Sequence, residues 1–207
     1  MAQGATDKLY DYWRSKLDGD RIPDRIDMLM SEMKDVLPQF MLLERSNQGA
    51  SFRIAGSDVC TTHRSELKGT ALRSIFVHQE AIDALVEKVF EKEVAFRIAT
   101  RLKSEWGYAE FDTILLPLRN GSEGVVRMAA AQSPTTTLWW RGSYNVSLHT
   151  ILKVDELPWR RGSTIVRDPR LQPPAYEAPV FEFARRGRPP EGRKVRHLTV
   201  IEGGVHG

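Results

Sequence analysis

Hydrophobic positions in the first half of the chain recur at helical spacing in three places. Residues 5–17 carry apolar side chains three or four apart, which predicts an amphipathic helix with Thr6 as its N-cap. A second helix is predicted over 26–36, and Pro38 would end it because the residue before a proline disfavours helix. Its apolar stripe would consist of Met28, Leu29, Met33 and Val36. The strongest helical pattern covers 79–92, where Ile82, Leu85, Val86, Val89 and Phe90 share one face.

Strand-like patterns occur in two blocks, one on each side of the 79–92 helix. The first block, 40–44 and 51–55, is joined by a short turn and predicts a hairpin. The second block contains the runs 94–102, 109–118 and 125–131. Helices placed between two blocks of strands predict an α+β fold, with a five-stranded antiparallel sheet and helices on one face.

These patterns divide the chain into three regions. Residues 1–38 form a predicted N-terminal helical cap, 39–134 the core, and 135–207 an irregular extension rich in proline and basic residues. Within the extension the pattern weakens: 148–152 could form a strand, and 180–183 and 197–201 are short apolar runs that could pair with another segment. We expect the hydrophobic core to include Phe40, Phe52, Ile54, Phe96, Ile98 and Ile114.

Composition narrows the class of protein. An apolar fraction of 41% and a charged fraction of 28% are typical of a globular chain and argue against disorder. No apolar run approaches the roughly 18 residues that span a bilayer, so we expect no membrane span. We also expect no secretory signal. The single cysteine, Cys60, excludes an internal disulfide and fits a reducing compartment, so we expect a cytoplasmic protein.

The net charge of +3 conceals an asymmetry between the two parts of the chain. Residues 141–207 contain 12 Lys/Arg and 7 Asp/Glu, a net of +5, and the remaining residues have a net of −2. A basic tail on a mildly acidic body suggests an anionic partner, although such charge also serves solubility alone. The candidate anion-binding residues are Arg160, Arg161, Arg185, Arg186 and Arg188.

An ordered series of short motifs resembles a known family. The series consists of Tyr12-Trp13, Pro23 with Arg25 and Asp27, Leu37-Pro38, Phe52-Arg53-Ile54-Ala55-Gly56, Glu66-Leu67-Lys68-Gly69 and the ending 198–203. It resembles PAS-domain proteins, in particular the small, mostly stand-alone bacterial type common in alphaproteobacteria. The resemblance implies a sensory or regulatory module without catalysis, whose sheet encloses a small cavity. It also implies pairing with a second copy or with a signalling protein.

The candidate ligand pocket lies between residues 58–72 and the sheet. Its predicted residues are Cys60, His63, Leu72, Phe96 and Trp106. Relatives usually have an aromatic residue and a glycine before the Glu66–Gly69 motif, and the polar segment 62–65 replaces them here, which alters the pocket entrance. We predict no cofactor, because the sequence around Cys60 lacks the context of a photoreactive flavin cysteine, and His78 stands too early on its helix for a haem ligand.

We predict no metal site and no catalytic residues. Cys60 and His63 are three positions apart and have only His78 nearby, whereas zinc sites need three or four ligands. The sequence also has no nucleophile motif, glycine-rich phosphate loop or paired zinc histidines.

Four aromatic residues are candidates for a partner interface: Tyr12, Trp13, Trp139 and Trp140. The adjacent tryptophans cannot both face one side of a sheet, and the N-terminal helix must cover its apolar stripe with the same chain or a second copy. The leading hypothesis is therefore a non-catalytic PAS regulator that acts through a protein partner, with or without a small ligand. The alternative is a factor that binds nucleic acid or a nucleotide second messenger, and a third class is a purely structural scaffold.

Overall fold

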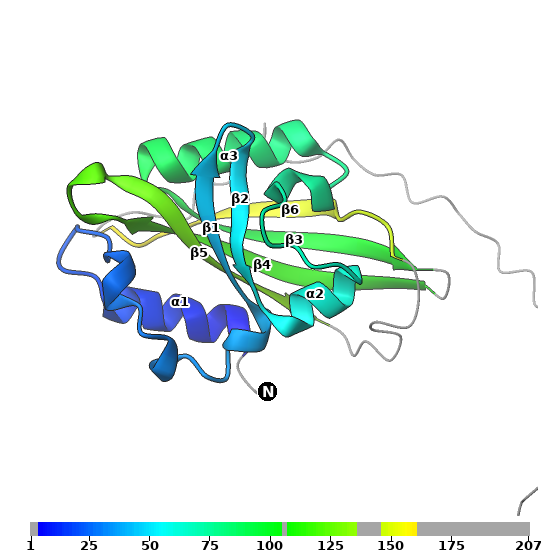
Figure 1. The fold of residues 1–207 in the computed structure, drawn as a ribbon, viewed down its shortest axis with the longest axis horizontal. Helices are drawn as coiled ribbons and strands as arrows, with labels where there is room; N and C mark the ends of the chain where they lie inside the picture. Colours follow the sequence, from blue (N-terminus) through cyan, green and yellow to red (C-terminus); the bar gives the residue numbers. More distant parts are fainter. Residues whose placement is uncertain (1–3, 105–106, 136–145, 161–207) are drawn as a thin grey trace, which may run out of the picture. The chain divides into compact units, whose positions relative to one another are not determined.

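The computed structural model describes residues 4–104, 107–135 and 146–160, which form an antiparallel sheet with helices on both faces (Figure 1). The strands are β1 (Phe40–Ser46), β2 (Gly49–Ala55), β3 (Ala95–Ser104), β4 (Gly107–Arg119), β5 (Val125–Pro134) and β6 (Thr150–Leu157). The α-helices are α1 (Ala5–Ser15), α2 (Ser57–His63) and α3 (Gln79–Lys92). Short 3-10 helices are η1 (Arg25–Asp27), η2 (Met30–Glu32), η3 (Leu37–Gln39), η4 (Leu72–Ile75) and η5 (Gly121–Glu123).

The strand order β2-β1-β5-β4-β3-β6 confirms the predicted antiparallel α+β sheet and adds one strand. Every neighbouring pair is antiparallel. The additional strand, β6, lies in the region predicted to be irregular and pairs with β3 from Ala95↔Leu157 to Arg101↔Thr150. It begins later and runs further than the predicted strand over 148–152. By pairing with β3, β6 satisfies backbone groups that an edge strand would leave open.

Alternation along β4 separates the two faces of the sheet. Asp112 points to the outer face, where its carboxylate accepts a hydrogen bond of 2.9 Å from the Thr6 hydroxyl of α1 and pairs with Arg97 at 3.2 Å. The next residue, Thr113, points to the inner face, where its hydroxyl accepts a hydrogen bond from the Gln132 amide. The helices α2 and α3 cover this inner face, and the N-terminal cap covers the outer one (Figure 1).

The side chain of Trp13 anchors α1 to the outer face. It is fully buried, and its indole Nε1 donates a hydrogen bond of 2.9 Å to the backbone carbonyl of Pro117 in β4. Trp159, just after β6, packs edge-on against it with ring centres 5.7 Å apart. The prediction of Thr6 as the N-cap is wrong, because α1 begins one residue earlier and the Thr6 hydroxyl bonds to Asp112. Gly4 is the N-cap instead.

The helix predicted over 26–36 is wrong, because two 3-10 helices separated by extended residues occupy this segment. Asp24 and Asp27 form a reciprocal capping box around the first of them, which stops after one turn. The backbone N–H of Leu29 then donates to the Tyr12 hydroxyl instead of continuing a helix. As a result Met28 is buried, but Leu29 is 48% exposed.

A β-bulge in the first hairpin corrects the predicted core position of Ile54. Leu42 pairs with Ile54 and the next residue, Leu43, pairs with Phe52, so Arg53 is the extra residue on β2. Phe52 is therefore buried on the inner face, whereas Ile54 is 41% exposed. The other five predicted core residues are buried, namely Phe40, Phe52, Phe96, Ile98 and Ile114.

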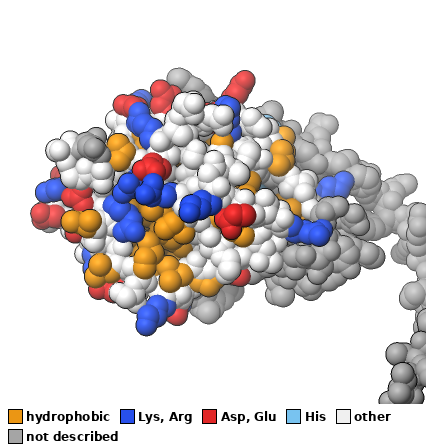
Figure 2. Space-filling model, in the orientation of Figure 1, with side chains coloured by type: hydrophobic (Ala, Val, Ile, Leu, Met, Phe, Trp, Pro, Cys, Tyr) orange, Lys and Arg blue, Asp and Glu red, His pale blue; other side chains and the backbone are white. Residues whose placement is uncertain are grey.

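The face of the molecule turned to the viewer in Figure 1 carries exposed hydrophobic side chains beside Lys and Arg side chains (Figure 2). On β1 and β2 the charges are paired, since Glu44 contacts Arg53 at 2.8 Å and Arg127 at 3.0 Å. These pairs are partly exposed, so each contributes little to stability.

Truncation of Trp13 tests whether α1 is part of the fold. We expect Trp13→Ala to lower the free energy of unfolding by about 3–5 kcal/mol, because it opens a cavity under α1 and removes the bond to Pro117. The neighbouring Tyr12→Ala, on the half-exposed side of the same helix, should cost only about 1 kcal/mol. Urea unfolding of both variants gives the comparison, and equal losses would contradict this packing.

Candidate functional site

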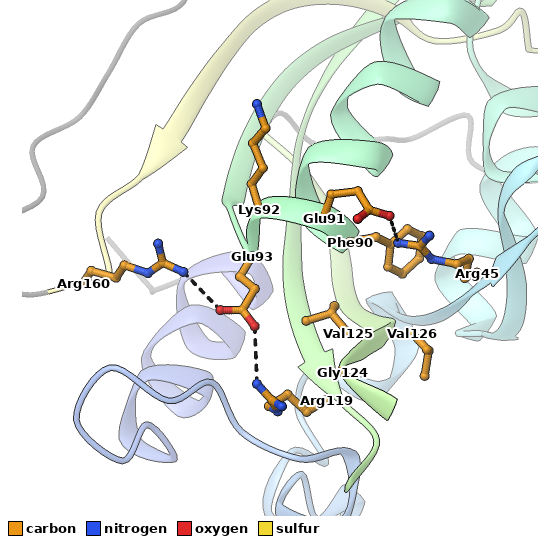
Figure 3. A pocket seen from close by; sticks show the side chains of 10 residues that line it. All are labelled: Arg45, Phe90, Glu91, Lys92, Glu93, Arg119, Gly124, Val125, Val126 and Arg160. Atoms are coloured by element: carbon orange, nitrogen blue, oxygen red, sulfur yellow. Dashed lines mark hydrogen bonds and ion pairs between the residues drawn. The ribbon is translucent and has the colours of Figure 1, made fainter. Parts of the chain in front are cut away.

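Two places in the described residues combine polar side chains in a way that suits binding. One is an open cleft at the C-terminal end of α3, with a volume of 770 Å³ (Figure 3). The other is a group of polar side chains on the inner face of the sheet, under α2, which we call the imidazole cluster. It consists of His63, Thr100, Gln132 and His149, packed against the rings of Phe76 and Phe111.

The cleft is lined by cations above an apolar floor. Its basic residues are Arg45, Lys92, Arg119 and Arg160, its acidic residues are Glu91 and Glu93, and its apolar floor is formed by Phe90, Val125 and Val126. The basic side chains come from the end of β1, the end of α3, the end of β4 and the residues after β6. The tertiary fold, and not a local basic run, therefore creates the site.

Glu93 organises the left half of the cleft as drawn in Figure 3. It caps α3 in the left-handed conformation, with φ of 56°, where the chain turns towards β3. One carboxylate oxygen pairs with Arg119 at 3.4 Å and the other pairs with Arg160 at 3.1 Å. The Trp159 indole donates a hydrogen bond of 3.0 Å to the Glu93 carbonyl and stacks under Arg160.

Arg45 occupies the opposite side of the cleft. Its guanidinium group lies 4.6 Å from the centre of the Phe90 ring and pairs with Glu91 at 2.7 Å (Figure 3). This cation–π contact and ion pair hold the guanidinium flat against the helix. The charge of Arg45 is therefore already paired with the carboxylate of Glu91, whereas Arg119 and Arg160 share the carboxylate of Glu93.

In the imidazole cluster, His63 from α2 and His149 from the segment before β6 lie with ring centres 5.2 Å apart. The Thr100 hydroxyl lies 2.9 Å from Nδ1 of His149, and Gln132 hydrogen-bonds to His63. Each ring nevertheless has a buried Nε2 atom without a hydrogen-bond partner among the described residues. Buried polar atoms are nearly always paired, so both nitrogens remain available to a further polar group.

Burial keeps both imidazoles neutral near pH 7. It lowers the pKa of His63 to about 4, and the hydrogen bond between His63 and the Gln132 side chain opposes this shift. It also lowers the pKa of His149 well below the usual value, and the nearby His63 adds to that effect. A neutral imidazole has one donor and one acceptor nitrogen. The chemistry of the cluster therefore suits an uncharged polar group and disfavours a cation.

The structure places the predicted ligand-pocket residues in different surroundings. His63 belongs to the imidazole cluster, whereas Leu72 and Phe96 are core residues that are 2% and 1% exposed. The Cys60 thiol is half-buried and lies 3.8 Å from the carbonyl of Ala55. Trp106 lies outside the described residues. Within the described ranges, no three His, Cys, Asp or Glu side chains are grouped so that they could hold a metal ion.

The predicted partner interface needs a correction at Trp13. Its side chain is fully buried against β4 and so cannot contact a partner in this fold. Tyr12 is half-buried, and its hydroxyl donates to Glu32 at 2.9 Å within the same chain. The apolar stripe of α1 is thus covered by its own sheet. Trp139 and Trp140 lie outside the described residues.

Of the predicted anion-binding residues, the structure describes only Arg160, which it places in the cleft. Arg161, Arg185, Arg186 and Arg188 lie outside the described residues. His149, Thr100 and Gln132 were not predicted, because they are scattered over three segments. Arg119 and Glu93 were not predicted either, since their only local signal is a charged residue directly at the end of a predicted strand or helix.

The neutral imidazoles predict a specific loss of stability in acid. The pKa of His63 is about 4 in the folded protein and 6.5 in the unfolded chain, so the unfolded chain binds more protons between these values. The contribution of His63 is complete above pH 6.5 and falls by about 3 kcal/mol as the pH drops to 4. Urea unfolding between these pH values should show a flatter pH dependence for His63→Gln than for the wild type. His78→Gln, at the start of α3, is the control, and parallel curves for wild type and His63→Gln would contradict the assignment.

Comparison with known proteins identifies the fold family. A family model described as a PAS domain matches residues 1–131, which is more than half of the chain. No curated protein and no solved structure matches the chain. In the described part, no helix combines the length and apolar character that crossing a membrane requires. PAS domains are sensory or regulatory modules that commonly mediate protein interactions. The chain belongs to the PAS-domain family.

Proposed function

We propose that this chain is a non-catalytic cytoplasmic regulator that binds a small uncharged ligand at the imidazole cluster and acts through a protein partner. The observation that carries the proposal is the pair of buried, unpartnered Nε2 atoms on His63 and His149. A ligand with a polar group would satisfy these nitrogens. The rings of Phe76 and Phe111, with centres 5.6 and 5.1 Å from that of His149, would contact its apolar part.

The backbone around His149 supports a route from ligand to partner. The N–H of His149 donates to Ile75 at 2.8 Å, and the N–H of Val77 donates to the carbonyl of His149 at 2.9 Å. Phe76 and His149 form a parallel bridge and contact each other on the inside. The neighbouring Val77 and Leu148 are 51% and 42% exposed. A partner that contacts these two apolar side chains would respond to a change in the position of His149.

A purification under native conditions tests the ligand. We expect the wild-type protein to retain a small molecule that mass spectrometry detects after denaturation, and expect His149→Gln to retain much less of it. His78→Gln is the matched histidine control and should retain it fully. If the wild-type protein retains no compound and shows no thermal shift with a panel of uncharged metabolites, the chain is a scaffold and the ligand proposal fails.

The same preparation tests the partner. Replacement of Leu148 by Ser should release a protein that copurifies with the wild-type chain, because an exposed apolar contact is lost. Ile26 is 79% exposed on the N-terminal cap, so Ile26→Ser controls for the loss of an exposed apolar side chain. Equal recovery of the copurified protein with both variants would exclude Leu148 from the interface.

A further inference from the structure

The cleft at the end of α3 contains an arginine, Arg119, that has an N–H donor without a hydrogen-bond partner among the described residues. In the described part of the chain, Arg119 makes one ion pair, with Glu93, and at 3.4 Å this pair is long for a charge-assisted hydrogen bond. The Nε atom of Arg119 is buried and has no hydrogen-bond partner among the described residues. A guanidinium group has five N–H donors, and a buried donor without a partner is costly. The position of Arg119 therefore suits an acceptor with more oxygens than Glu93 offers.

Glu93 acts as an internal anion between two guanidinium groups. Its two oxygens are divided, one to Arg119 and one to Arg160, so neither arginine has a bidentate contact with it (Figure 3). A phosphate group has the same negative charge or more and carries additional acceptor oxygens in a tetrahedral arrangement. It can accept more than one hydrogen bond from each arginine, whereas the Glu93 carboxylate offers one oxygen to Arg119 and one to Arg160.

We propose that this cleft binds a small organic phosphate of nucleotide size, whose phosphate displaces the Glu93 carboxylate from between Arg119 and Arg160. The volume of 770 Å³ lies in the range of small-molecule sites. Val125 and Val126 provide an apolar floor for the uncharged part of the ligand. The site is separate from the imidazole cluster, so it does not depend on the ligand proposed there.

The carboxylates of the cleft favour a compact ligand over a nucleic acid. Glu91 and Glu93 place negative charge inside the site, and the C-terminal carbonyls of α3 add a partial negative charge. An extended polyanion would be repelled by this negative charge along its length, whereas a small phosphate occupies only the space between Arg119 and Arg160. The same negative charge makes Glu93 a competitor of the ligand, which gives the proposal a distinctive test.

Isothermal titration of the full chain with ATP, and separately with pyrophosphate, tests the proposal at low ionic strength. We expect ATP to bind in the sub-millimolar range, and expect Glu93→Gln to bind it about 5–10-fold more tightly because the competing charge is removed. Arg119→Gln and Arg160→Gln should weaken binding about 10-fold or more. Arg53→Gln is the matched control, because Arg53 pairs with Glu44 on β2 outside the cleft.

Four outcomes would overturn the proposal. The first is the absence of binding of either probe to the wild-type protein at about 10 mM. The second is ATP binding of wild-type affinity in Arg119→Gln. The third is ATP binding that Glu93→Gln leaves unchanged or weakens, which would mean that Glu93 only holds the two arginines in place. Tighter binding of a nucleic acid oligomer than of ATP would instead favour a polyanion partner and would also contradict it. Glu93→Gln retains the size of the side chain, so its result does not depend on the arginine variants folding.

Discussion

The hydrogen bond between the Trp13 indole and the Pro117 carbonyl is the contact on which the arrangement of the chain depends. A proline within an interior strand usually breaks a ladder. Here the pairing of β3 with β4 ends at Phe96↔Leu115, so Pro117 lies beyond it and removes no hydrogen bond of that ladder. Its carbonyl still needs a donor, and Trp13 supplies one from α1. The N-terminal cap is thereby fixed on the outer face of the sheet.

The same tryptophan connects the N-terminal cap to the cleft. Trp13 packs edge-on against Trp159, and the Trp159 indole donates to the carbonyl of Glu93. The position of Glu93 at the end of α3 in turn sets where its carboxylate meets Arg119 and Arg160. A series of direct contacts therefore links the packing of Trp13 on the outer face to the position of Glu93 in the cleft.

Periodicity in the sequence correctly predicted elements whose apolar side chains all pack on one surface. The helix over 79–92 is correct at both ends, because its buried stripe faces one sheet and its other positions face solvent. The segment 26–36 was predicted incorrectly, since its apolar residues serve separate contacts and Asp24 and Asp27 close a turn early. Ile54 was misplaced because a bulge changes the strand period by one residue, which a pattern of alternation cannot reveal.

The candidate sites were harder to predict because tertiary structure assembles them. His63 was predicted because it lies in the segment 58–72 beside the sheet, but its neighbour His149 lies 86 positions away in the chain. Arg160 was singled out with other arginines for charge alone, and its actual neighbours are Glu93 and Trp159. Residues that meet only through β6 could not be paired without knowing that β6 joins the sheet.

β6 is the element that relates the two sites, since His149 immediately precedes it and Arg160 follows it. Among the described strands it lies at the edge of the sheet and pairs with β3 alone. At its start the Thr100 hydroxyl anchors His149 to β3, and after its end Glu93 anchors Arg160 to α3. Elements with few stabilising neighbours shift more easily than interior strands. A ligand that changed either anchor would act on this strand, so β6 physically connects the imidazole cluster with the cleft.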